Sequence, residues 1–240
     1  SKLVLNYGSQ TIIPKEFESL VKNRNAFSIK PFLRAYDSIL KEDIFDSVNE
    51  LPFVIVGSGL AAIEVSYALR KRWGDRPLKL LCDSRKINNT ILKSLRNSNI
   101  DLVEKLNFDY GKILLCTGNT SPLWAQKKLL DSDSHGRIIT NQNLQIKSFS
   151  GIFAVGDCAV VGSAKRPASG VFAVKVVNTL VQNLKKDIEG RSLKKWFPQK
   201  IGLQIVNIFP SHHPKAFAIY RNFVFGPSFI FWILKHKIDL

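Results

Sequence analysis

Uninterrupted apolar runs recur along the chain and predict buried strands. Phe53-Val54-Ile55-Val56 consists entirely of β-branched and aromatic residues, and comparable runs occupy residues 78–83, 100–103, 113–118 and 152–157. A strand that is apolar at every position, rather than at every second one, is typical of a parallel sheet that is covered on both faces. We therefore expect these segments to form the interior of such sheets.

Amphipathic stretches lie between these runs and predict helices. Apolar positions return at helical spacing within residues 14–50, 63–73 and 89–97, and a longer helix is expected to open at Pro167 and to end at Gly190. The remaining segments are a short strand over residues 3–9, a strand-like stretch over 196–208 and an aromatic-rich tail over 216–239. Strands that alternate with helices in this way predict an α/β fold with a mostly parallel sheet.

The turn after the first buried run carries the spacing of a dinucleotide-binding motif. It reads Gly57-Ser58-Gly59-Leu60-Ala61-Ala62 and leads from a strand into a helix. Gly57 allows the tight turn, Gly59 lets the backbone approach a pyrophosphate, and Ala62 is small enough for the helix to pack on the strand. The helix N-terminus then offers free N–H groups to the phosphates. A glycine turn that merely packs a helix, without a ligand, is the alternative.

An acid at the end of the next strand supports nucleotide binding. Asp83 closes the run over residues 78–83, where a carboxylate can accept a hydrogen bond from a ribose 2′-hydroxyl. Arg85 follows two residues later, and a guanidinium can hold the 2′-phosphate of NADP. Asp83 would repel that phosphate, so the sequence favours NAD over NADP.

Charge and cysteine content narrow the classes of partner. The formal net charge is +16 in 240 residues, which favours an anionic partner such as a nucleotide, a nucleic acid or an acidic membrane surface, unless it reflects compositional drift.

Cys82, Cys116 and Cys158 lie far apart in apolar runs, which argues against a disulfide framework, a zinc ribbon and a redox dithiol. His212 and His213 are adjacent and form a poor ligand pair, so no metal site is expected. A reducing, cytoplasmic compartment fits this pattern.

Four segments together resemble one superfamily. Residues 57–64 (GSGLAAIE) are similar to the nicotinamide motif of the FAD-dependent pyridine nucleotide-disulfide oxidoreductases, and residues 114–122 (LLCTGNTSP) to their strand-Thr-Gly segment. Residues 151–159 (GIFAVGDCA) resemble their late flavin motif, and residues 4–10 (VLNYGSQ) the end of their first FAD segment. The absence of a cysteine pair points to the type II NADH dehydrogenase-like branch. Three further segments, residues 166–184 (RPASGVFAVKVVNTLVQNL), 196–207 (WFPQKIGLQIVN) and 232–239 (WILKHKID), resemble the NADH dehydrogenase-like domain that is fused to selenide, water dikinase in some proteins.

The resemblance implies the cofactors and the residues that bind them. It implies NAD(H) bound by Gly57, Ser58, Gly59, Leu60, Ala62, Glu64, Asp83, Thr117 and Gly118. It implies FAD bound by Gly8, Ser9, Gly156, Asp157, Ala168, Ser169 and Gly170. In such a protein a hydride passes from NADH to the flavin and the electrons pass on to an acceptor such as a quinone. Glu64 is the one residue considered for a catalytic role, facing the cleft; a glutamate that complements the helix dipole is the alternative.

The chain departs from the family pattern in two places. The N-terminal Gly-x-Gly-x-x-Gly for the FAD adenylate is missing, and the connection over residues 104–112 is too short for the usual hairpin. The chain begins with Ser1 and contains no methionine. We therefore expect a fragment of a longer flavoprotein, which puts its retention of FAD in question.

The resemblance divides the chain into four expected segments: residues 1–12 as the end of the first FAD segment, 13–145 as the NAD(P)H-binding domain, 146–190 as the second FAD segment and 191–240 as a C-terminal segment.

In the C-terminal segment, residues 223–234 are apolar and are followed by Lys235-His236-Lys237. Twelve residues are too few to span a bilayer. A peripheral membrane anchor and a helix packed on the body or on a partner domain, such as selenide, water dikinase, both fit.

Three functions from different classes are consistent with these observations. The first is an FAD-dependent NADH dehydrogenase-like oxidoreductase with Rossmann-like parallel sheets. The second is a non-enzymatic nucleotide-binding or regulatory domain of a fusion protein. The third, a nucleic-acid-binding module, is the weakest, because the cations are spread along the chain and no recognition motif is present.

Overall fold

The computed structural model describes residues 1–45, 51–122, 125, 130–162, 169–199, 201–208 and 214–239. Contacts divide the chain into two compact units. One contains Ser1–Gln10 and Asn119–Gly202, and the other contains Thr11–Gly118 and Leu203–Leu240. We call them the flavin-motif unit and the nucleotide-motif unit, after the sequence motifs that each contains. The expected segment boundaries differ from this division, because the chain changes unit after Gly118 rather than after residue 145, and the C-terminal segment is shared between the units.

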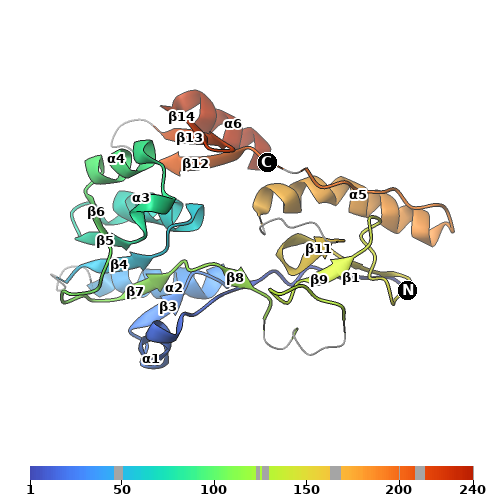
Figure 1. Ribbon diagram of the computed structural model, residues 1–240, viewed down its shortest axis with the longest axis horizontal. Coiled ribbons are helices and arrows are strands. Elements are labelled where there is room, and N and C mark those ends of the chain that lie inside the picture. The colour runs from blue at the N-terminus through green and yellow to red at the C-terminus, as the bar shows by residue number, and fades with distance from the viewer. Residues whose placement is uncertain are drawn as a thin grey trace. The chain divides into compact units, whose positions relative to one another are not determined.

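The nucleotide-motif unit is built on a five-stranded parallel sheet (Figure 1). Its strands, in spatial order, are β3 (Ala26–Ser28), β7 (Ile113–Leu115), β4 (Phe53–Val56), β5 (Leu78–Leu81) and β6 (Ile100–Val103). The central strand β4 is buried at every position. The expected parallel sheet, covered on both faces, is therefore confirmed here.

Alternate residues of the central strand belong to two hydrophobic cores, as the pleat of a strand requires. The side chains of Phe53 and Ile55 lie in the core on the face of the sheet that carries most of the helices. Those of Val54 and Val56 lie in the core on the other face, where they pack with Phe17 and its neighbours.

The helical elements of the unit's first part are η1 (Lys15–Phe17), α1 (Glu18–Lys22), α2 (Phe32–Phe45), α3 (Leu60–Trp73), η2 (Ser84–Lys86) and α4 (Asn89–Asn97).

The expected helix over residues 14–50 is wrong in its middle. Strand β3 interrupts it and pairs in parallel with β7. The turn before β3 contains Arg24 with φ at 60°, a left-handed conformation that a continuous helix does not allow. Ala26 by itself favours a helix, whereas Phe27 does not, so the pairing with the edge of β7 overrides the local preference.

The C-terminal module of this unit consists of a three-stranded antiparallel sheet and a helix. Its elements are β12 (Gln204–Ile208), β13 (Lys215–Tyr220), β14 (Phe223–Ser228) and α6 (Phe229–Asp239). Val206, Ile208 and Phe217 join the same core as α3. The expected strand over 196–208 forms only from Gln204 onward, and the aromatic tail folds into two strands and one helix. No helix among the described residues is long and apolar enough to cross a membrane.

The flavin-motif unit contains two parallel strand pairs and one long helix. Strand β1 (Leu3–Leu5) pairs with β10 (Ile152–Ala154), and β9 (Ile138–Thr140) pairs with β11 (Ala159–Val161). Helix α5 (Gly170–Ile188) follows, and a short helical turn, η4 (Gly156–Cys158), separates β10 from β11. Two short strands, β2 (Gln10–Thr11) and β8 (Asn119–Thr120), complete the elements. Pro167, the expected first residue of the long helix, lies outside the described residues.

A buried tyrosine links α3 to α4 and makes stability depend on alkaline pH. The Tyr67 hydroxyl donates to Ser94 Oγ at 2.8 Å, and burial, only partly offset by this hydrogen bond, raises the pKa of Tyr67 to about 12. In the unfolded chain a tyrosine ionises near pH 10. Because the pKa of Tyr67 is raised in the folded state, its ionisation does not affect the free energy of unfolding below pH 10 and lowers that free energy as the pH rises toward 12. The free energy of unfolding should therefore decrease by about 1.4 kcal/mol between pH 9 and pH 11.

Urea unfolding at pH 9 and pH 11 measures this loss. The Tyr67→Phe variant is less stable at pH 9, because Ser94 loses its partner, but it should show a smaller decrease on going to pH 11. Equal decreases in the two proteins would mean that Tyr67 does not contribute to the alkaline sensitivity.

Candidate functional site

The carboxyl ends of β4, β5 and β7 meet at one edge of the parallel sheet. The chain proceeds from β4 through β5 to β6 on one side and then returns to place β7 on the other side of β4. Ligands of open α/β sheets bind where the strand order reverses in this way, beyond the carboxyl ends of the strands. The Gly57 turn after β4 lies at this edge.

Gly57 is required by close packing as well as by its backbone angle. Its φ is +145°, and a Cβ placed on it would lie 2.5 Å from the carbonyl oxygen of Cys116, which follows β7. The same Cβ would lie 3.3 Å from Cβ of Ala62, itself fully buried. The small residues at both positions therefore allow α3 and the end of β7 to approach the turn. This packing is the one that the sequence motif predicts for Ala62.

Gly59 and the start of α3 have the geometry of a phosphate site. Gly59 is the N-cap of α3 and offers no side-chain cap, and a Cβ placed on it would meet nothing within 4 Å. The first N–H groups of a helix have no partner within the helix, and they carry a partial positive charge. Leu60 and Ala61 begin this helix, so their N–H groups are positioned for an anion. The residues present therefore fit the pyrophosphate of a dinucleotide.

Ser58 connects the glycine turn to the next strand. Its Oγ accepts a hydrogen bond from the backbone N–H of Asp83 at 2.9 Å. The sequence suggested a direct role for Ser58 in holding the nucleotide, and the structure shows that its hydroxyl fixes the position of Asp83.

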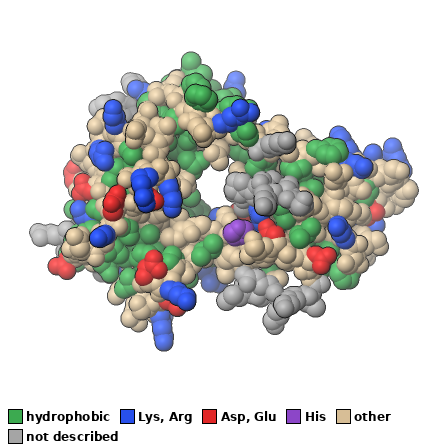
Figure 2. Space-filling view, viewed as in Figure 1, with side chains coloured by type: hydrophobic (Ala, Val, Ile, Leu, Met, Phe, Trp, Pro, Cys, Tyr) green, Lys and Arg blue, Asp and Glu red, His purple; other side chains and the backbone are tan. Residues whose placement is uncertain are grey.

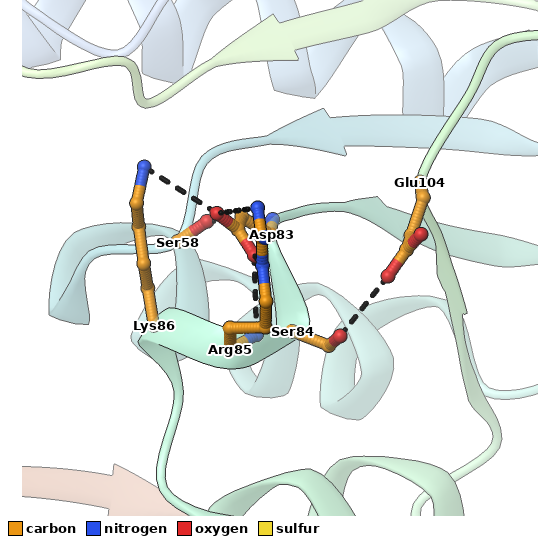
Figure 3. A network of polar contacts seen from close by, with 6 residues as sticks. All are labelled: Ser58, Asp83, Ser84, Arg85, Lys86 and Glu104. Atoms are coloured by element: carbon orange, nitrogen blue, oxygen red, sulfur yellow. Dashed lines mark hydrogen bonds and ion pairs between the residues drawn. The ribbon is translucent and has the colours of Figure 1, made fainter.

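Asp83 forms the centre of a polar network (Figure 3). Its carboxylate accepts hydrogen bonds from Arg85 Nε at 2.9 Å and Nη2 at 3.1 Å, and Lys86 Nζ lies 3.6 Å away. The hydrogen bonds from Arg85, more than the charge of Lys86, lower the pKa of Asp83 to about 2. Asp83 is therefore ionised at neutral pH, and its carboxylate already has a cationic partner before any ribose arrives.

Ser84 and Glu104 extend this network to β6. Ser84 Oγ donates to Glu104 Oε1 at 3.0 Å, and Glu104 follows directly after β6. Sequence reasoning missed Ser84, Lys86 and Glu104. The signal for Glu104 was available, because it is an acid placed at the end of a buried strand, as Asp83 is.

An open groove of about 1080 Å³ runs past these strand ends. Its lining includes Gly57, Ser58, Asp83, Arg85 and Thr117. The other lining residues are Pro14, Glu16, Phe17, Leu20, Val56, Leu81, Cys82, Lys86, Glu104, Lys105, Leu106 and Tyr110. The lining therefore mixes apolar side chains with many charged ones, which suits a ligand that has both apolar and charged parts.

The Thr-Gly segment after β7 holds the preceding loop. Thr117 Oγ1 donates to the carbonyl of Ile12, and the N–H of Ile12 donates to the carbonyl of Gly118 at 3.2 Å. Thr117 lines the groove, as Gly57, Ser58 and Asp83 do, whereas the other expected residues are outside its lining: Gly59, Leu60, Ala62, Glu64 and Gly118. The nine residues expected to bind NAD(H) therefore separate into groove-lining groups and supporting ones.

Glu64 is not among the residues that line the groove, and the expectation that it faces the cleft stays a prediction. Its Oε1 accepts from Lys235 Nζ at 2.9 Å and lies 3.4 Å from the backbone N of Asn207. It also lies beyond the first turn of α3, so it does not complement the dipole as an ordinary first-turn acid either. Glu64 instead joins α3 to the C-terminal module, because Lys235 belongs to α6 and Asn207 to β12. Its partner lies 171 residues away in sequence.

The flavin-motif unit brings two distant sequence motifs together. Ser9 Oγ donates to Asp157 Oδ2 at 3.2 Å, although 148 residues separate them. Gly156 has a φ of +77°, and a Cβ placed on it would lie 2.5 Å from Asn6 Oδ1. Asn6, which sequence reasoning missed, therefore packs against the Gly-Asp motif. At Gly8 a Cβ would meet nothing within 4 Å.

The start of α5 belongs to the same unit. Ser169 is its N-cap without a side-chain cap, and Gly170 is its first residue. The first N–H groups of a helix have no acceptor within the helix itself. Ala168, also expected to bind FAD, lies outside the described residues. Gly8, Ser9, Gly156 and Asp157 have the spacing and small side chains that a flavin ribityl chain would need, and they therefore fit part of an FAD site.

Among the described residues, no group of three or more His, Cys, Asp and Glu side chains is placed to hold a metal ion. His212 and His213, rejected above as a ligand pair, lie outside the described residues.

Comparisons with known proteins give relatives of low identity. No protein-family model matches the chain. It is 25% identical over 235 residues to ferroptosis suppressor protein 1 of Homo sapiens, covering 82% of this chain and 59% of that protein. It is 28% identical over 176 residues to a probable NADH dehydrogenase of Dictyostelium discoideum, covering 54% of this chain and 39% of that protein. The chain therefore spans little more than half of the human protein.

A solved structure shares the fold. The sulfide:quinone oxidoreductase of Aquifex aeolicus superposes with a TM-score of 0.66 at 16% identity, over 100% of this chain and 67% of that one. The expected Rossmann-like α/β fold is confirmed, and the chain is similar to oxidoreductases of the pyridine nucleotide-disulfide type. The expected fragment status and the fusion to selenide, water dikinase stay predictions.

Proposed function

We propose that this chain is part of an FAD-dependent NADH dehydrogenase-like oxidoreductase, and that NADH binds in the groove at the Gly57 turn. The observation that carries the proposal is this turn itself, where Gly57, Gly59 and the uncapped start of α3 are arranged as a pyrophosphate site. The adenine ribose would then lie toward Asp83 at the end of β5.

The chain's own residues would act by binding and orientation. Gly59 and the N-terminus of α3 hold the pyrophosphate, and Ser58 keeps Asp83 in place for the ribose. In the flavin-motif unit, Asp157 would hold the ribityl chain, while Ser9 fixes the carboxylate. A bound FAD supplies the chemistry of accepting a hydride and passing electrons onward. A quinone is the acceptor class we propose, since the structural neighbour named above is a quinone oxidoreductase.

A specific observation also favours the alternative of a non-enzymatic nucleotide-binding domain. Among the described residues, the flavin-motif unit contains two separate two-stranded sheets, β1 with β10 and β9 with β11, where the nucleotide-motif unit has one sheet of five strands. A flavin held by so few elements would be retained weakly.

Titrating the purified chain with NADH and with FAD distinguishes these functions. NADH should quench the intrinsic tryptophan fluorescence with a dissociation constant on the order of 10–100 µM, within the usual range for enzyme substrates. If FAD also binds, NADH should reduce it under nitrogen, with loss of the 450 nm band, and a water-soluble quinone should restore the band. Binding of NADH without binding of FAD would favour the non-enzymatic alternative. Absence of NADH binding would overturn both.

A further inference from the structure

The groove continues past Asp83 to the end of the next strand of the sheet. The strand order places β4, β5 and β6 side by side, and neighbouring strands lie about 4.8 Å apart. In the proposed function, the pyrophosphate lies at the end of β4 and the adenine ribose at the end of β5. The base and the pyrophosphate are attached to opposite sides of that ribose. One further strand spacing in the same direction therefore brings the base to the end of β6.

The residues that follow β6 line this part of the groove. They are Glu104, Lys105 and Leu106, and Tyr110 joins them four residues later. Leu106 and Tyr110 are half-buried and pack against the core that contains Phe17. Packing holds these two side chains in place, and each gives the groove an apolar surface that suits a flat aromatic ring.

Glu104 adds a carboxylate at the same point. Ser84 Oγ donates to Glu104 Oε1 at 3.0 Å, and Figure 3 shows the carboxylate directed toward the turn that carries Ser84 and Asp83. Arg85 interacts with Glu104 electrostatically, but it donates its side-chain hydrogen bonds to Asp83. A carboxylate has about four acceptor positions, so Glu104 can accept a further hydrogen bond while Ser84 holds it.

We propose that Glu104 accepts a hydrogen bond from the exocyclic amino group of adenine and so makes the groove selective for adenine nucleotides. The inference rests on the proposed binding of NADH in this groove. Adenine carries an amino group, which donates, where hypoxanthine and guanine carry a carbonyl oxygen, which accepts. An ionised carboxylate is an acceptor only, so it attracts the amino group and repels the carbonyl oxygen. Glu104 then selects the base, whereas Asp83 contacts the ribose.

Titrating the full chain with NADH and with reduced nicotinamide hypoxanthine dinucleotide tests this contact. The two nucleotides differ only in the base, where the carbonyl oxygen of hypoxanthine replaces the amino group of adenine. Quenching of tryptophan fluorescence gives both dissociation constants. The parent chain should bind NADH about tenfold more tightly or better, because hypoxanthine brings a carbonyl oxygen to the carboxylate. E104Q should lower this ratio to about threefold or less, because the amide of glutamine can either accept from the amino group or donate to the carbonyl oxygen.

E16Q is the matched control for the loss of charge. Glu16, on η1, lines the same groove, so E16Q makes the same chemical change at another point of its wall. Figure 2 shows Asp and Glu side chains beside Lys and Arg side chains on the surface of the nucleotide-motif unit, so the loss of one carboxylate changes the overall field little. E16Q should therefore keep the ratio of the parent chain within about twofold.

The outcomes separate this inference from the proposed function. A parent chain that binds both nucleotides equally well, or an E104Q chain that keeps the parent ratio, would overturn Glu104 as the selecting residue and leave NADH binding in place. Equal reductions of the ratio in E16Q and E104Q would also overturn it, because the charge of the groove rather than a contact would then select the base. A chain that binds neither nucleotide would overturn this inference together with the proposed function.

Discussion

Exchanging Gly57 for alanine is expected to weaken NADH binding by about 100-fold or more and to lower the melting temperature by roughly 5–10 °C. A Cβ at this position would lie 2.5 Å from the carbonyl oxygen of Cys116 and 3.1 Å from its carbonyl carbon. Both are backbone atoms, so the end of β7 or the turn itself has to move. The φ of +145° adds strain for any residue with a side chain.

The expected loss of affinity follows from the movement of the turn. Gly57 directly precedes Ser58 and Gly59, so a shift of the turn away from Cys116 displaces the start of α3 and the hydrogen bond from Asp83 to Ser58. A displacement of even 1 Å separates the pyrophosphate from the helix N–H groups that should hold it. Fluorescence titration with NADH and differential scanning calorimetry measure the two effects on the same protein sample.

Gly59→Ala is the matched control, because it separates binding from folding. A Cβ on Gly59 would meet nothing within 4 Å, and the backbone there is already in a conformation that alanine adopts. This variant should melt within about 2 °C of the parent chain, because nothing in the fold is disturbed. It should still bind NADH at least about tenfold more weakly, because the added methyl occupies the space through which the pyrophosphate approaches. A Gly57→Ala chain that binds NADH as well as the parent does would contradict the proposed site.

The parallel sheet and the glycine turn were predictable because their signals are local. Phe53-Val54-Ile55-Val56 has no polar position, and a strand with that composition has to be covered on both faces. The spacing of Gly57, Gly59 and Ala62 specifies a turn and a packing contact that lie within six residues. Both features therefore followed from short stretches of sequence without knowledge of distant partners.

The parts that were not predictable depend on partners far along the chain. Strand β3 forms because β7, almost 90 residues later, offers a hydrogen-bonding edge. Glu64 contacts the C-terminal module because the fold brings Lys235 and Asn207 next to it. Residues 223–234 are one apolar run in the sequence, yet they divide into β14 and α6 because β13 provides a pairing edge for the first half and a packing surface for the second. No local pattern contains this information.

The choice between NADH and NADPH is expected to depend on Asp83, and removing its carboxylate should reverse it. In the Asp83→Ser variant, the ratio of NADPH affinity to NADH affinity should rise by about 100-fold, because a like charge facing the 2′-phosphate is removed. Arg85 is 88% exposed at its side chain and Lys86 is 72% exposed. Both cations would then be free to bind that phosphate, and serine can still hydrogen-bond to a hydroxyl or a phosphate.

The sequence favoured NAD because Asp83 repels a 2′-phosphate, and the network around Asp83 explains why that preference should be modest. Arg85 donates two side-chain hydrogen bonds to the carboxylate, and Lys86 lies 3.6 Å from it. These cations offset much of the repulsion that NADPH would meet. The parent chain should therefore bind NADPH measurably, roughly tenfold more weakly than NADH, rather than exclude it.

Two further variants test whether Asp83 itself, rather than the net charge of the groove, sets the preference between NADH and NADPH. Arg85→Ser removes the principal partner of Asp83 and should lower NADPH affinity by about tenfold, because the carboxylate then faces the phosphate with less compensation. Glu104→Gln removes a negative charge elsewhere in the same groove, where the side chain accepts from Ser84 rather than from Arg85, and should change the ratio by less than about threefold. Titrations of all four proteins with both nucleotides give the ratios. If Glu104→Gln raised the NADPH ratio as much as Asp83→Ser did, the net charge of the groove would decide the preference, and Asp83 would have no specific contact with the ribose.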